Sequence, residues 1–134
     1  MEFEITQIIK KYQLEEAIKF IHANNFSINT TVPKIATKFG QRILGLSIKH
    51  NGQIIGNIFY YYQPDFKYNN KIFKVVNFAT IYILDSYRGK GVASLMFEKT
   101  LKIFKNYIIT DYTPVGSIFY VLKKFDFGFM QNTR

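Results

Sequence analysis

The chain's strongest constraint on its fold is an abrupt change of pattern near residue 85. Residues 74–84 are an apolar run rich in β-branched side chains, and they are apolar on both faces, which predicts a central strand. Residues 85–91 carry two glycines and predict a tight turn. Residues 92–105 are apolar at helical spacing on two adjoining flanks, which predicts a helix lying deep against a sheet.

The first half of the chain predicts one helix and one hairpin. Residues 3–9 are compatible with a short strand or with the lead-in to a helix. Apolar residues repeat every three or four positions between about Lys10 and Asn24, which predicts an amphipathic helix. The pair Asn51-Gly52 favours a hairpin turn between strands Ile43–His50 and Gln53–Gln63.

The remaining segments complete an alternation of helices and strands. Residues 27–42 are ambiguous, with Pro33 opening a short helix at 34–39, and the polar segment 64–71 predicts a loop. A strand at 107–111, a helix at 114–124 with Thr113 as its N-cap, and an extended segment at 125–130 follow. This order predicts an α/β or α+β sandwich with a mixed sheet, folded as one domain over residues 1–134.

Composition narrows the chemistry. The 134 residues include no cysteine and two histidines, which argues against thiolate nucleophiles, disulfides and a histidine-rich metal site. The net charge of +9 and pI near 9.7 favour a phosphate-bearing ligand over a nucleic-acid surface without excluding the latter. No stretch approaches the roughly 20 apolar residues of a membrane span, and the acidic start resembles no signal peptide. We therefore expect a cytoplasmic protein without a bound metal.

The turn between the central strand and its helix has the makings of an anion site. The first amides of a helix lack internal partners and lie at the positive end of its dipole. Gly89 and Gly91 let a phosphate approach the backbone, and Arg88 and Lys90 add positive charge at the rim. The Walker pattern is absent, and Ser94 stands where the dinucleotide fingerprint needs its third glycine.

This segment resembles the acetyl-CoA loop of the GNAT (GCN5-related N-acetyltransferase) superfamily, whose pattern is [RQ]-x-x-G-x-[GA]. Arg88, Gly91 and Ala93 stand at the three fixed positions, between an apolar strand and an apolar helix. The resemblance implies a mostly antiparallel central sheet flanked by helices, with the match running from about residue 43 to 130. It also implies acetyl-CoA as cosubstrate.

The resemblance assigns the cofactor-binding residues. The backbone near Ile81 and Ile83 would pair with the pantetheine arm. The backbone amides of the loop would hold the pyrophosphate; these are the amides of Arg88, Gly89, Lys90, Gly91, Val92 and Ala93. An amine would then attack the thioester directly, with no covalent enzyme intermediate.

The chemistry downstream departs from the family pattern. Leu122 stands where many members carry the tyrosine that protonates the leaving thiolate, which leaves Tyr120 as the candidate acid. Asp111, at the end of the fifth strand, is the candidate base, and it is equally suited to capping the next helix. Tyr82 and His50 are further candidates, although His50 is more simply a polar residue beside a turn.

The C-terminal region departs as well, because only residues 125–130 stand where the family has a hairpin. Phe125, Phe127 and Phe129 alternate there, and an open aromatic edge predicts either a second subunit that covers it, as in a homodimer, or a tail that fills in. The leading hypothesis is an N-acetyltransferase for a small-molecule amine such as an amino sugar. The alternatives are a protein or aminoacyl-tRNA acceptor, and a non-catalytic module that binds CoA or nucleic acid.

Overall fold

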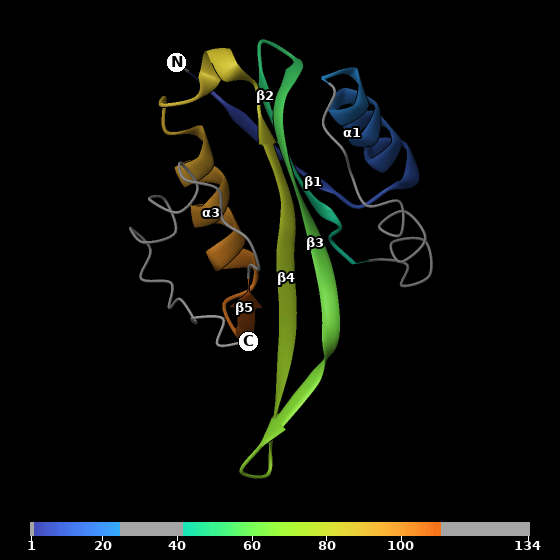
Figure 1. The fold of residues 1–134 in the computed structure, drawn as a ribbon, viewed down its shortest axis with the longest axis vertical. Coiled ribbons are helices and arrows are strands. Elements are labelled where there is room, and N and C mark those ends of the chain that lie inside the picture. The colour runs from blue at the N-terminus through green and yellow to red at the C-terminus, as the bar shows by residue number, and fades with distance from the viewer. Residues whose placement is uncertain (1, 25–41, 111–134) are drawn as a thin grey trace, which may run out of the picture.

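The fold is given by a computed structural model that describes residues 2–24 and 42–110 (Figure 1). In chain order the elements are β1 (Glu4–Ile8), α1 (Lys11–Ala23), β2 (Gly45–His50), β3 (Gln53–Tyr68), β4 (Lys71–Ile83), the 3-10 helix η1 (Asp85–Tyr87), α3 (Val92–Ile103) and β5 (Tyr107–Thr110). Residues 3–9, left open between two alternatives, thus contain a strand. The helices predicted from about residue 10 and from residue 92 are confirmed.

The strands form one sheet in the order β1-β2-β3-β4-β5, antiparallel except for the parallel pair β4–β5. Helix α1 covers one face and α3 covers the other (Figure 1). The predicted α+β class with a mixed, mostly antiparallel sheet flanked by helices is therefore confirmed. Because β4 and β5 run parallel, the connection between them has to return over one face of the sheet. This connection contains η1, the glycine turn and α3.

Each helix buries the apolar stripe that its sequence predicts. On α1, Leu14, Ala17 and Ile21 are buried against β-strand residues that include Phe59. On α3, Met96 and Phe97 are buried, and Phe97 packs on Phe78 of β4 with ring centres 5.0 Å apart. No helix in the described ranges is long and apolar enough to cross a membrane.

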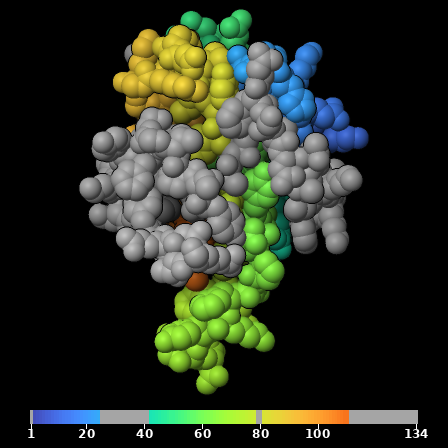
Figure 2. Space-filling model, viewed as in Figure 1, coloured from blue at the N-terminus to red at the C-terminus, as the bar shows by residue number. Residues whose placement is uncertain are grey.

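The loop predicted at 64–71 is wrong. Strand β3 continues to Tyr68 and β4 begins at Lys71, so the two strands extend as a ribbon beyond the helices (Figures 1 and 2). Pro64 and Asp65 fall at a register shift between Gln63 and Phe66, where a proline costs the ladder no hydrogen bond. The true turn is Asn69-Asn70, and both residues have positive φ.

Two tyrosines of β3 make the free energy of unfolding depend on pH in the alkaline range. Tyr60 Oη lies 2.7 Å from Thr100 Oγ1, and Tyr62 donates a 2.7 Å hydrogen bond to the carbonyl of Ile43. Burial raises the pKa of Tyr62 from 10.0 to about 12, and it raises the pKa of Tyr60 as well. In the unfolded chain both groups ionise near pH 10.

Above about pH 10 the unfolded state therefore binds fewer protons than the folded state, so the free energy of unfolding falls as pH rises toward 12. We expect Tyr62→Phe to make this fall shallower, because phenylalanine has no proton to lose. Urea denaturation followed by circular dichroism at a series of pH values measures the slope. Equal slopes for the variant and the parent chain would contradict the assignment.

Candidate functional site

The turn after β4 has the geometry of an anion cradle. Gly89 and Gly91 both have φ of 78°, and Gly91 is the N-cap of α3. The first bond of the helix runs from Leu95 N to the carbonyl of Gly91, at 3.1 Å. The amides of residues 92–94 precede that bond, and within the described part of the chain none of them donates to a backbone carbonyl.

The space beside these glycines is open. Among the described residues, a Cβ built on Gly89 or Gly91 meets no atom within 4 Å, which leaves room for a phosphate to approach the amides. Val92 is buried under the first turn of α3 and Ala93 is half-buried, which fixes the helix start on the sheet. The residues present thus fit a diphosphate group, held by backbone rather than by side chains.

Arg88 is tied back onto its own loop. Its Nε donates to the carbonyl of Ile83 at 3.1 Å, and its Nη1 lies 3.0 Å from Asp85 Oδ1. The guanidinium also lies 5.9 Å from the ring centre of Tyr82. Arg88 therefore braces the turn against the end of β4, whereas the sequence predicted a mobile charge at the rim.

The backbone of Ile83 faces the edge of β4 that lies opposite β3. Leu84 N donates to the carbonyl of Ile55, so the amide of Leu84 faces β3. The carbonyl of Ile83 faces the opposite edge, where Arg88 reaches it. Ile81, two residues earlier, faces that same edge, because backbone polar groups alternate along a strand.

Strand β5 pairs with β4 from Lys74 to Asn77, and Thr110, the partner of Asn77, is the last described residue of β5. Beyond Asn77, β4 has no strand partner on that side among the described residues. Helix α3 packs on β4 through Phe97 and Phe78, and the glycine turn lies between the end of β4 and the start of α3 (Figure 1). The structure thus brings Ile81, Ile83 and the 88–93 loop to one border of the sheet.

Sequence reasoning missed two polar side chains at the last described pair of β4 and β5. Asn77 is 1% exposed, and its Nδ2 donates to Thr110 Oγ1 at 2.9 Å, at the last paired position of β4 and β5. The signal was visible as an asparagine inside an otherwise apolar strand, since a buried amide needs a partner. Which partner it has depends on the register of β5, which the sequence alone does not give.

The predicted catalytic residues Asp111 and Tyr120 lie outside the described residues, as do Leu122 and the segment 125–130 on which the dimer prediction rests. Their roles remain predictions. Lys90 lies at the turn, with its ammonium 5.6 Å from the ring centre of Tyr87.

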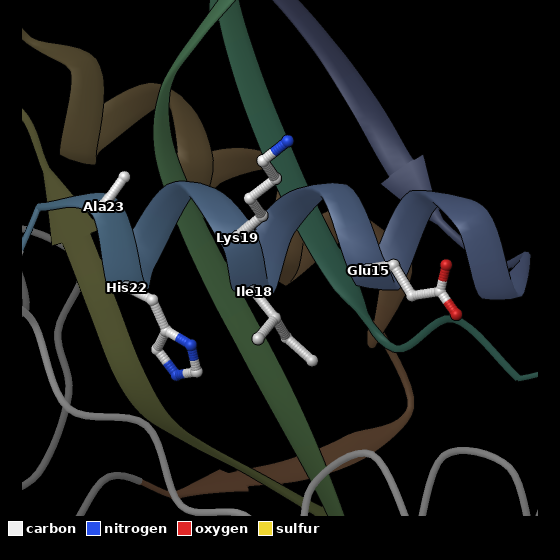
Figure 3. Close-up of a pocket in the computed structure, with 5 residues that line it drawn as sticks. All are labelled: Glu15, Ile18, Lys19, His22 and Ala23. Atoms are coloured by element: carbon white, nitrogen blue, oxygen red, sulfur yellow. The ribbon is translucent and has the colours of Figure 1, made fainter.

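A separate hollow of about 580 Å³ lies beside α1 (Figure 3). Its lining residues are Glu15, Ile18, Lys19, His22 and Ala23. Figure 3 shows Glu15, Ile18 and His22 spaced along one side of the helix. None of the residues predicted for the cofactor lines it.

Comparisons with known proteins agree with this geometry. The acetyltransferase (GNAT) family matches the chain over residues 10–115, which is most of its length. No curated protein matches the sequence.

Three solved structures share the fold at low identity. AAC(6')-Iy in complex with the bisubstrate analogue CoA-S-monomethyl-acetylneamine aligns with a TM-score of 0.71 and 17% identity, covering 100% of this chain and 96% of that one. A predicted acetyltransferase from Clostridium acetobutylicum, solved with acetyl-CoA, gives 0.61 and 19% over 98% and 92%. A ribosomal-protein-alanine N-acetyltransferase from Brucella melitensis biovar Abortus 2308 gives 0.64 and 13% over 100% and 97%.

Proposed function

Because the chain belongs to the acetyltransferase (GNAT) family, we propose that it moves an acetyl group from acetyl-CoA directly to a primary amine of a small molecule, such as an amino sugar. The observation that carries the proposal is the border formed by the edge of β4 beyond Asn77, which pairs with no described strand, and the start of α3, which has no side-chain cap. An extended arm ending in a diphosphate matches that border along its length.

Within this proposal each segment has one task. The amides of residues 89–93 hold the pyrophosphate, with Gly89 and Gly91 allowing its close approach, whereas the amide of Arg88 already donates to the carbonyl of Asp85. The edge at Ile81 and Ile83 pairs with the pantetheine arm as an added strand would. The carbonyl of Ile83 keeps its bond from Arg88, so its remaining lone pair and the backbone of Ile81 are what the arm meets.

The thioester then lies toward the last described pair of β4 and β5, where Asn77 and Thr110 supply polar groups beside the reacting carbonyl. Transfer requires that the amine be held within reach of that carbonyl and lose a proton as the thiolate gains one. We propose that Asp111 accepts the proton of the amine and that Tyr120 donates a proton to the thiolate. We also propose that the protein acts as a homodimer.

A small-molecule acceptor is supported by the ligand of the AAC(6')-Iy structure, which joins CoA to an acetylneamine in one molecule. The Brucella structure is described as acting on a ribosomal protein, so the fold serves both acceptor classes. An amine panel that includes both acceptor classes therefore distinguishes between them.

Two measurements test the proposal. We expect calorimetry to detect binding of acetyl-CoA and CoA, and weaker binding of pantetheine, which lacks the diphosphate. We expect a panel of amino sugars, peptides with free N-termini and aminoacyl-tRNA to release free thiol with the amino sugars first. Absence of CoA binding would contradict the cofactor assignment, and binding without thiol release for any amine would contradict catalysis.

A further inference from the structure

Tyr87 joins the glycine turn to the far end of the β2–β3 hairpin. It is the last residue of η1 and stands immediately before Arg88. Its hydroxyl lies 2.6 Å from His50 Nδ1, and the two rings meet edge-on with centres 5.4 Å apart. The ring of Phe3 packs against both, with its centre 5.6 Å from that of His50 and 6.2 Å from that of Tyr87. Residues from three distant parts of the chain thus converge behind the turn.

The other polar contacts of this turn are local. Tyr87 N donates to the carbonyl of Leu84, and Arg88 N donates to that of Asp85. Arg88 reaches only Asp85 and the end of β4. Among the described residues, the His50–Tyr87 hydrogen bond is the side-chain bond that links residues 85–91 to a strand other than β4.

The bond is placed to control the shape of the cradle. A tyrosine fixed at both its ring and its hydroxyl sets the direction in which the chain enters Arg88, Gly89 and Gly91. Glycine backbones have many accessible conformations, so an anchor directly before them removes alternatives that would not present the amides. The ammonium group of Lys90 lies over the same ring, so the position of Tyr87 also affects the position of this charge.

We propose that His50 is a positioning residue which, through Tyr87, holds the 85–91 turn in the conformation that binds the diphosphate of CoA. This inference rests on the proposed function. It assigns to His50 no contact with substrate and no proton transfer, and it gives this histidine a part other than that of a residue flanking a turn.

Four variants isolate the bond. Tyr87→Phe keeps the ring beneath Lys90 and removes only the hydroxyl. His50→Phe keeps a ring against Phe3 and removes Nδ1, whereas His50→Asn keeps a polar atom near the Nδ1 position. We expect Tyr87→Phe and His50→Phe each to raise the Kd for CoA about three- to tenfold, the effect of one net hydrogen bond. The double variant should be no weaker than either single one.

We expect His50→Asn to restore part of the affinity. We expect the KM for acetyl-CoA to rise while kcat and the KM for the amine stay unchanged, because the bond acts on cofactor binding alone. Amide hydrogen exchange in the free protein should accelerate in residues 85–91 of His50→Phe, with the β-strands unaffected. This second measurement does not depend on any ligand.

The outcomes separate the two claims. If the parent chain fails to bind CoA, the proposed function is wrong and this inference falls with it. If the parent chain binds and the single variants bind equally well, only the inference is overturned. Additive losses in the double variant, or unchanged exchange in residues 85–91, would also overturn it.

Discussion

Replacing Gly91 by valine is expected to weaken CoA binding on the order of 100-fold. The residue has φ of 78°, a conformation that a β-branched side chain adopts only under strain. The turn can relieve that strain by changing its conformation, which moves the amides of α3 away from the ligand. If it does not relax, the added side chain stands in the open space where the phosphate approaches. Calorimetric titration with CoA measures the change.

Asn70→Val is the matched control. Asn70 also has positive φ, at 62°, and it lies at the tip of the β3–β4 ribbon, far from η1 (Figure 1). Both variants should lose similar stability, because both force valine into a left-handed conformation. We expect only Gly91→Val to lose CoA affinity. Equal affinities for the two variants would show that the turn is not the phosphate site.

Truncating Phe97 to alanine is expected to lower the free energy of unfolding by about 3–5 kcal/mol. Phe97 is 1% exposed and packs on Phe78 between α3 and β4. Its loss leaves a cavity under the helix whose first turn forms the cradle. Because whole domains are stable by only about 5–15 kcal/mol, this one change removes a large share of the total. Urea denaturation followed by circular dichroism measures it.

Leu95→Ala serves as the comparison on the same helix. Leu95 is 39% exposed, so we expect its truncation to cost less than about 1 kcal/mol. If both truncations cost the same, α3 does not pack on the sheet through the face described above.

The sequence predicted the centre of the molecule well, because that is where its patterns are unambiguous. Residues 74–84 are apolar on both faces because α3 packs on one face of β4, where Phe97 contacts Phe78, and α1 packs on the other, where Phe20 contacts Tyr82. The stripe of α1 is regular because one side of the helix is buried and the other is solvated. In both places burial alone decides the residue type, so periodicity is sufficient.

Prediction failed where the chain leaves that core. Neither of the described α-helices covers the ribbon from Gln63 to Lys74, and Phe66, Tyr68 and Ile72 are exposed there together with polar residues. Without one buried face the alternation that identifies a strand is lost. Pro64 then suggested a loop, although a register shift accommodates it.

The candidate site divides along similar lines. The glycine turn is a local feature, so its sequence was sufficient to predict a tight turn before α3. The Asn77–Thr110 and His50–Tyr87 contacts join residues 33 and 37 positions apart, and they depend on strand register that no local pattern encodes. Arg88 shows a further limit, because nothing in the motif says that its side chain turns back to Ile83.

The parallel pairing of β4 and β5 has a kinetic consequence. Strands β2, β3 and β4 follow one another through short turns, so they can assemble by successive local steps. Strand β5 joins β4 only after the connection through η1 and α3 has closed, and closing such a long loop is slow because its entropy is lost before its contacts form. The cradle lies inside that loop. We therefore expect it to form late, in the step that completes the sheet and after the antiparallel strands have paired.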